Sequence, residues 1–243
     1  NDRMSVLEHV AELKSASHRA RDLVQQILTF SRTQKPSRSV TKVDHAVRDA
    51  LKLLRSSLPS SVVMKSSFDE QAPLVLADPS QVHQVMMNLG TNAAYAMRER
   101  GGELSLHVDL ADVDEALCRR RPDLRPGRYA RISVTDTGDG MDEATLKRIF
   151  EPFFTTKKQG EGTGLGLAVV HGIVRDHDGA IAVESRPGVG TRVEVYLPEH
   201  IGEPSAAQVS PAALPRGRGE RILVVDDEEA LCVSLTALLK RLG

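Results

Sequence analysis

The chain has 243 residues, of which 40% are apolar and 27% are charged, and its formal net charge is −1. This composition is typical of a globular protein, and a net charge near zero creates no overall field that would attract a nucleic acid. No apolar run approaches the ~20 residues that a membrane-spanning helix needs, and few aromatic rings are available for stacking on nucleobases. Cys118 and Cys232 are far apart in sequence, so we expect free thiols and a cytoplasmic location.

Apolar residues three and four positions apart predict one long helix from Met4 to Ser31. The heptad seam is imperfect, because serine or alanine stands at several of its positions. The helix is either an ordinary amphipathic helix that packs on its own domain or one helix of a bundle. We favour the bundle, because Lys35-Pro36 ends the pattern before any nearby partner segment appears.

Helical and β-rich patterns alternate between residues 36 and 198, which predicts an α/β two-layer sandwich with helices on one face of a mixed sheet. Helices are expected at Asp44–Leu54, Pro79–Arg98, Asp142–Phe150 and Gly164–Asp176. Strands are expected at Val62–Phe68, Leu104–Leu110, Tyr129–Thr135, Ala180–Glu184 and Thr191–Leu197. The arginine-rich segment Ala111–Arg128 is interpreted as a solvated loop, because acidic residues stand just before the arginines.

The segment GEGTGLGLAVV, from Gly160 to Val170, is the most informative stretch of the chain. Glycine-dense sequence before an apolar helix can close backbone N–H groups on a phosphate. Three segments precede it in the chain: NLGTNAAYAM (Asn88–Met97), DTGDGM (Asp136–Met141) and FEPFFTTK (Phe150–Lys157). Over roughly residues 78 to 198, the four together resemble the nucleotide-binding signature of the sensor histidine kinases. The resemblance implies a Bergerat-type ATPase fold with ATP and Mg²⁺ as ligands.

A helix that begins after Asp78 would place Gln84, Asn88 and Asn92 on one polar face. Amide oxygens suit Mg²⁺, which bridges to nucleotide phosphates and keeps several waters. The resemblance makes Asn92 the Mg²⁺ ligand, and the three amides in a row favour this over an asparagine that only bonds backbone. Tyr95 stands where many relatives carry a basic residue near the phosphates, so the contact at that position stays open.

Asp136 follows a predicted strand and precedes Thr137-Gly138-Asp139-Gly140. A carboxylate there can accept a hydrogen bond from the adenine amine, and glycines allow the base to approach the main chain. The resemblance assigns this role to Asp136, although the motif alone is equally typical of an Asx turn. Thr191 matches the family's last element, in which the threonine hydroxyl helps to hold the adenine-bound water or the aspartate.

The resemblance places Phe150–Lys157 at the start of a mobile lid over ATP. We expect at least one of Phe150, Phe153 and Phe154 in the core, and Lys157, rather than Lys158, to neutralise γ-phosphate charge. The resemblance implies the following nucleotide-binding residues: Asn92, Tyr95, Asp136, Gly138, Gly140, Met141, Phe150, Thr156, Gly162, Thr163, Gly164, Leu165, Gly166, Leu167 and Thr191.

The identity of Asn88 helps to decide which reaction the site catalyses. ATPases of the topoisomerase, mismatch-repair and chaperone types place a glutamate one helical turn before the Mg²⁺-binding asparagine, where it polarises water. An amide cannot take a proton at neutral pH, whereas a histidine acceptor already carries a lone pair on its ring nitrogen. The sequence therefore favours a protein histidine kinase over a chaperone-type ATPase. A non-catalytic nucleotide-binding module that regulates a partner is the other alternative.

The acceptor histidine is expected outside the chain, because His9 and His18 are not followed by the acidic residue of the family pattern. Asp226 and Asp227 resemble the Mg²⁺-binding pair of receiver domains, of which only the first strand and helix are expected. The predicted organisation is a bundle helix (1–35), an ATP-binding domain (36–198), a linker (199–219) and a receiver fragment (220–243). The resemblance thus implies a hybrid sensor histidine kinase, truncated at both ends, that dimerises and passes phosphate to a receiver domain or response regulator. Any membrane anchor would lie in the missing N-terminal part.

Overall fold

The computed structural model of the protein describes residues 38–69, 73–121, 123–158 and 161–201, together with 222–225, 235–237 and 239–240. The predicted helix at Met4–Ser31 and the pair Asp226 and Asp227 lie outside the described residues. The chain divides into two units, Asn1–Pro204 and Ser205–Gly243, and each is described by itself.

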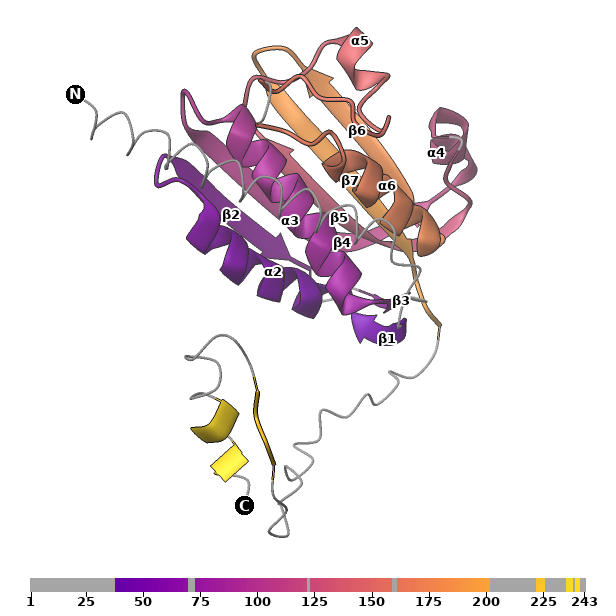
Figure 1. Ribbon diagram of the computed structural model, residues 1–243. Coiled ribbons are helices and arrows are strands. Elements are labelled where there is room, and N and C mark those ends of the chain that lie inside the picture. The colour runs from indigo at the N-terminus through magenta and orange to yellow at the C-terminus, as the bar shows by residue number, and fades with distance from the viewer. Residues whose placement is uncertain are drawn as a thin grey trace, which may run out of the picture. The chain divides into compact units, whose positions relative to one another are not determined.

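The first unit has two layers, with three helices on one face of a five-stranded sheet (Figure 1). The strands are β2 (Val62–Phe68), β4 (Gly102–Val113), β5 (Gly127–Asp136), β6 (Ala180–Arg186) and β7 (Gly190–Pro198). Their order is β2-β4-β5-β7-β6, in which β2 and β4 pair in parallel and the other neighbours pair antiparallel. The helices of this layer are α2 (Val43–Ser57), α3 (Pro79–Ala96) and α6 (Gly166–Asp176). The predicted two-layer sandwich with a mixed sheet is confirmed.

The described part of this unit also contains four short elements, and none of them was predicted with these bounds. They are β1 (Ser39–Lys42) and β3 (Leu74–Ala77), which form a separate antiparallel pair, and the helices α4 (Glu115–Arg120) and α5 (Glu143–Leu146). Strands and helices of four to six residues show too little periodicity to be recognised in a sequence. The predicted helix at Asp142–Phe150 is therefore too long.

The interpretation of residues 111–128 as a loop was wrong, although most of its arginines are exposed to solvent as expected. Strand β4 continues to Val113, and α4 follows it before β5 begins. The acidic residues that suggested solvation include the helix N-cap, since the Asp114 side chain accepts a 2.7 Å hydrogen bond from the Leu117 N–H. Arg119 and Arg120 lie in the last turn, where positive charge favours the helix dipole.

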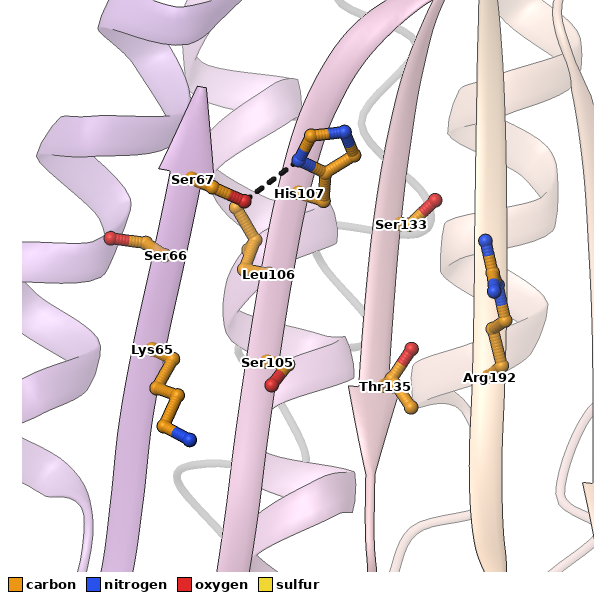
Figure 2. Close-up of a pocket in the computed structure, with 9 residues that line it drawn as sticks. All are labelled: Lys65, Ser66, Ser67, Ser105, Leu106, His107, Ser133, Thr135 and Arg192. Carbon is orange, nitrogen blue, oxygen red and sulfur yellow. Dashed lines mark hydrogen bonds between the residues drawn. The ribbon is translucent and has the colours of Figure 1, made fainter. Parts of the chain in front are cut away.

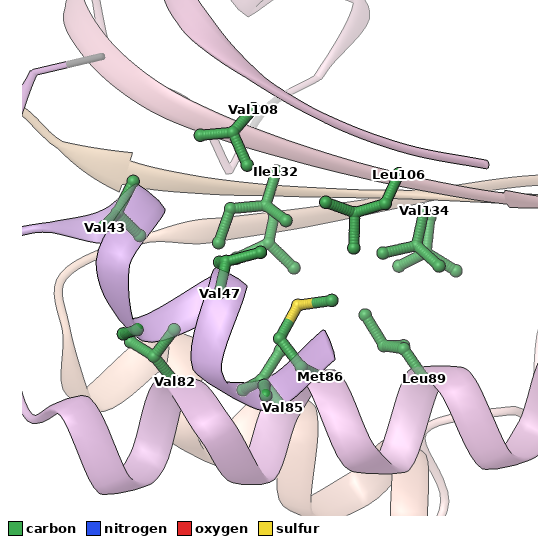
Figure 3. Close-up of a cluster of buried hydrophobic side chains, with 14 of the residues drawn as sticks. Val43, Val47, Val82, Val85, Met86, Leu89, Leu106, Val108, Ile132 and Val134 are labelled. Carbon is green, nitrogen blue, oxygen red and sulfur yellow. The ribbon is translucent and has the colours of Figure 1, made fainter. Parts of the chain in front are cut away.

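The core lies between the helices and the inner face of the sheet (Figure 3). Alternate residues of the central strands point into it, such as Leu106 of β4 and Ile132 of β5, and Met86 of α3 packs against them. Full burial of such a side chain stabilises the fold by about 1.5–3 kcal/mol. Helix α2 approaches α3 at Gly90, where any Cβ would overlap the Leu54 side chain. This packing fixes α3 on the sheet.

The start of α3 is held by two hydrogen bonds of Asp78. Its side chain caps the helix by accepting from the Ser80 N–H at 2.9 Å, and its own N–H donates to His177 Nε2 at 3.0 Å. His177 is 4% exposed, and its Nδ1 lies 2.8 Å from the Ile173 carbonyl oxygen. The pairing assigns the proton to Nδ1 of a neutral ring, because Nε2 accepts. The His177 side chain thereby joins the backbone at the start of α3 to the backbone of α6.

The opposite face of the sheet has a buried hydrophobic cluster around Tyr129 and Tyr196 and, beside it, an open polar part (Figure 2). Hydroxyls of Ser105, Ser133 and Thr135 line the central strands, with Lys65 on β2 and Arg192 on β7 at either side. A hollow of about 640 Å³ lies here, and its described lining includes none of the motif residues. The candidate site therefore lies elsewhere, on the side of the sheet that carries the helices.

In the second unit, residues 235–237 and 239–240 are helical. The buried strand predicted at Ile222–Val225 is not formed, and Ile222, Leu223 and Val225 are exposed. A strand becomes buried and hydrogen-bonded only against neighbouring strands. Among all the residues described, no helix is both long and apolar enough to cross a membrane.

Candidate functional site

The polar face predicted for α3 is formed, and it meets the start of α6. Asn88 and Asn92 are half-buried, and a Cβ at Gly166 would lie 3.2 Å from Asn88 Oδ1 and 3.7 Å from Asn92 Nδ2. Glycine therefore allows the first turn of α6 to approach both amides. The N-cap of α6, Leu165, provides no side-chain hydrogen bond, so the N–H groups of this turn are available to an anion.

Lys157 reaches the same amide face from the segment before α6. Its Nζ donates to Asn92 Oδ1 at 2.9 Å and lies 4.4 Å from the centre of the Tyr95 ring. Burial lowers the pKa of Lys157, and the nearby charge of Arg98 lowers it further. The contact shows that Asn92 Oδ1 faces a position that accepts a cation.

A Mg²⁺ ion fits this position only in company with ligand oxygens. Within the described ranges no cluster of three histidine, cysteine or acidic side chains could hold a metal alone. Asn92 supplies one amide oxygen, which is the kind of donor that Mg²⁺ accepts when a bound polyphosphate provides others. The donor set thus suits a metal that arrives with a nucleotide rather than a resident ion.

Asp136 ends β5 as a desolvated carboxylate. Its Oδ1 accepts from the Gly138 N–H at 2.9 Å, so the Asx turn exists. Burial raises the pKa of Asp136, backbone hydrogen bonds from Gly138 and Thr191 oppose this rise, and the charge of Asp139 adds to it. The turn and a ligand-binding role are compatible, because each carboxylate oxygen can accept more than one hydrogen bond.

Ser185 organises the backbone beside Asp136, and sequence reasoning missed it. Its Oγ accepts from the Met141 N–H at 2.8 Å, donates to the Gly190 carbonyl at 3.1 Å and lies 2.9 Å from Thr191 Oγ1. The Thr191 hydroxyl is thus paired with Ser185, and it is the Thr191 backbone that bonds Asp136. A single serine within a strand carries no sequence signal for this function.

The motif residues of α3 and those of the turn after Asp136 meet at the C-terminal end of α3. The Asp139 N–H donates to the Ala96 carbonyl at 3.1 Å, and a Cβ at Gly138 would lie 2.6 Å from the Ala96 Cβ. Gly140 has φ +66°, and any Cβ there would overlap the Arg186 carbonyl. Glycine is therefore required on both sides of Asp139.

The segment before α6 forms a loop that is closed by the Phe153 N–H donating to the Gly164 carbonyl at 3.0 Å. The expectation of a buried phenylalanine was wrong. Phe150 and Phe154 are half-buried, and Phe153 is 68% exposed with φ +68°. Ile149 takes the buried position instead, because the chain leaves the core directly after it.

The other residues predicted from the glycine segment lie within or beside this loop. Thr156 is exposed, whereas the Thr163 hydroxyl accepts from the Leu165 N–H at 3.4 Å. Gly162 packs against the Lys157 side chain, since a Cβ there would lie 2.8 Å from Lys157 Cδ. Leu165 is buried and Leu167 half-buried. Most of the predicted residues are therefore brought together, whereas Thr156 is exposed to solvent.

Residues 77–201 match the family described as "Histidine kinase-, DNA gyrase B-, and HSP90-like ATPase". The match spans more than half of the chain, and the chain belongs to this family.

Its relatives include sensor kinases. It is 35% identical over 231 residues to the sensor kinase CckA of Brucella abortus (strain 2308), which covers 91% of this chain and 24% of that protein. It is 33% identical to sporulation kinase E of Bacillus subtilis (strain 168), covering 76% of this chain and 23% of the kinase. The chain thus spans about a quarter of the length of these two curated relatives.

Solved structures agree with this placement. The catalytic domain of histidine kinase ThkA has a TM-score of 0.54 and 26% identity, over 67% of this chain and 96% of that domain. Residues 77–201 therefore form a catalytic domain of the histidine kinase ATPase fold, as found in sensor kinases.

Proposed function

We propose that the chain is the ATP- and Mg²⁺-binding catalytic region of a protein histidine kinase, which transfers the γ-phosphoryl group to a histidine outside this fragment. One observation carries the proposal. Asn92 Oδ1 accepts a hydrogen bond from the Lys157 ammonium beside the glycine turn at Gly166. In addition, the resemblance places the amide Asn88 where ATPases of the family need a base. The sensor-kinase relatives support the same choice.

The proposed roles follow from the contacts. Asp136 accepts from the adenine amine, and Gly138 and Gly140 let the base approach the backbone. The N–H groups at the start of α6 bind phosphate. Asn92 would hold Mg²⁺, and that ion would supply positive charge to neutralise the phosphate oxygens.

In the transfer, the lone pair of a neutral imidazole nitrogen forms an N–P bond while the bond from the γ-phosphorus to the β-bridging oxygen breaks and ADP leaves. Lys157 neutralises charge on the γ-phosphoryl group. Asn88 takes no proton, since its amide is neutral and its Nδ2 donates to the Gln84 carbonyl at 3.0 Å. A histidine acceptor is therefore the acceptor that this site can use without a base.

The test is transfer of label from γ-labelled ATP with Mg²⁺ to a purified acceptor hairpin of a sensor kinase, mixed with this chain. We expect acid-labile label on the hairpin, and its loss with Asn92→Ala. A lack of label despite ATP binding and hairpin association would instead favour a non-catalytic nucleotide-binding module.

A second prediction concerns Asn88. Glutamate at position 88 would supply a base one turn before Asn92. The rate of ATP hydrolysis by Asn88→Glu should therefore exceed that of the unsubstituted chain by about tenfold or more. Phosphate release measured on both proteins checks this. Asn88→Gln, which adds length without a base, is the matched control, and equal hydrolysis by all three proteins would remove the argument from Asn88.

A third prediction concerns pH. Because its pKa is raised, Asp136 loses its acceptor carboxylate at a higher pH than an ordinary aspartate. The affinity for ATP should be highest above the pKa of Asp136, where the carboxylate is ionised, and should fall as the pH drops through that pKa. Asp139→Asn removes one cause of the rise, so its affinity should persist to lower pH. Calorimetric titration of both proteins in the same buffers checks this, and superimposable pH profiles would contradict it.

The wider organisation is part of the proposal. The segment 1–35 is assigned to a dimerisation bundle and 220–243 to a receiver domain, which makes the parent a hybrid kinase and a homodimer. After the histidine, a receiver domain or response regulator would take the phosphoryl group. A longer chain that carries the acceptor helix should phosphorylate itself without an added hairpin.

A further inference from the structure

The segment before α6 places two of its own charged groups beside the end of α3 that carries Asn92. Lys157 Nζ donates to Asn92 Oδ1 at 2.9 Å. Four residues later, Glu161 Oε2 accepts from the Tyr95 hydroxyl at 2.7 Å and from Arg98 Nη1 at 3.0 Å. Asn92 and Tyr95 lie about one turn apart on α3, and Arg98 follows in the turn directly after the helix ends at Ala96.

Tyr95 and Arg98 together form a cradle for an anion, which the Glu161 carboxylate occupies. Tyr95 and Arg98 direct one hydroxyl and one guanidinium donor at the same carboxylate oxygen. The Arg98 guanidinium lies 3.9 Å from the centre of the Tyr95 ring, a stacked position that fixes its donors. Both bonds lower the pKa of Glu161, Tyr95 foremost, so its carboxylate is ionised.

The position of the Lys157 ammonium and the anion cradle are neighbours, as are the metal and the phosphates of a Mg²⁺-bound polyphosphate. Lys157 and Arg98 both lie against the Tyr95 ring, so the amide oxygen and the cradle are neighbours. Lys157 provides positive charge where Asn92 would meet a metal, and Glu161 provides negative charge where Arg98 would meet phosphate. Neither Asn92 nor Arg98 can bind the segment before α6 and a nucleotide with the same atoms.

We propose that Arg98 is a phosphate-binding residue of the nucleotide site, and that Glu161 is an internal competitor which occupies its guanidinium until the phosphates displace it. The inference rests on the proposed function, because it takes ATP as the ligand. Arg98 supplies the positive charge that Tyr95 cannot supply. The exchange is feasible because the pair is screened by solvent, with side-chain exposures of 36% for Arg98 and 46% for Glu161.

The test is the dissociation constant for a non-hydrolysable ATP analogue with Mg²⁺, measured by calorimetry beside that for adenosine. Arg98→Ala should raise the constant for the analogue about tenfold, since a charged hydrogen bond to phosphate is lost, and leave that for adenosine unchanged. Arg98→Lys should recover part of the loss. Glu161→Gln should lower the constant for the analogue about threefold, and this gain should disappear in the Arg98→Ala background.

Arg48→Ala is the matched control. Arg48 lies 3.7 Å from the centre of the Phe68 ring and 3.8 Å from Asp44, so it combines a ring contact with an acidic partner on α2. Its removal should leave both dissociation constants unchanged. Circular dichroism shows that each variant is folded.

Three results would overturn the inference. Weaker or unchanged binding by Glu161→Gln would show that Glu161 does not compete, and an equal loss of adenosine and analogue by Arg98→Ala would show a structural role. In both cases analogue binding by the unsubstituted chain leaves the proposed function intact. Failure of the unsubstituted chain to bind the analogue would overturn the proposed function and this inference together.

Discussion

Asp136→Asn should raise the dissociation constant for ATP about 100-fold or more, because a site built to accept a ligand N–H leaves buried groups unpaired when the acceptor is lost. The asparagine oxygen can still accept from the Gly138 N–H, as Asp136 Oδ1 does at 2.9 Å. Its NH₂ group, however, would face another donor, whether the Thr191 N–H or the adenine amine. Calorimetric titration of the two proteins measures the effect.

Asp139→Asn is the control for that result. Asp139 is exposed, and its N–H donates to the Ala96 carbonyl at 3.1 Å, so the substitution keeps the backbone contact. Its affinity for ATP at neutral pH should stay within about threefold of the unsubstituted chain, since an exposed charge near a site contributes little.

GTP presents an oxygen where ATP has the amine, so Asp136→Asn should reduce the preference for ATP over GTP. Retained ATP affinity in Asp136→Asn would mean that the carboxylate does not bind the base.

The layers of the fold and the polar face of α3 could be predicted because each depends on local periodicity. Asn88 and Asn92 are four residues apart, so any helix through them places both amides on one side. Asp136 was predictable for a related reason, since a strand pattern followed by glycines ends at a turn. The close approach of Gly166 to both amides agrees with the glycine motif.

The missed residues act through partners far away in sequence. Ser185 bonds Met141, and Glu161 bonds Tyr95, across separations of 44 and 66 residues. Ser185 belongs to no pattern, and the glycine segment that contains Glu161 carries no signal for a contact with Tyr95, so only the packed structure brings each side chain to its partner. The phenylalanines failed differently, because aromatic character suggests burial, whereas the loop leaves the core after Ile149.

Gly140→Ala should cost about 3 kcal/mol of unfolding free energy or more, because it combines a left-handed backbone with an overlap. Gly140 has φ +66°, and its Cβ would meet the Arg186 carbonyl, which is backbone and cannot rotate away. The strand pairing of β6 with β7 holds Arg186 opposite Gly190. Relief would therefore require the turn after Asp136 to separate from this hairpin, and ATP affinity should fall as well.

Gly188→Ala separates the two causes. Gly188 has φ +72°, but a Cβ there would meet no atom within 4 Å. Its substitution should cost about 1 kcal/mol, the conformational penalty alone, and leave ATP binding unchanged. Urea unfolding followed by circular dichroism measures both variants. Equal costs would mean that the backbone after Asp136 can yield at Gly140, and that the contact with Arg186 does not position the Asp136 carboxylate.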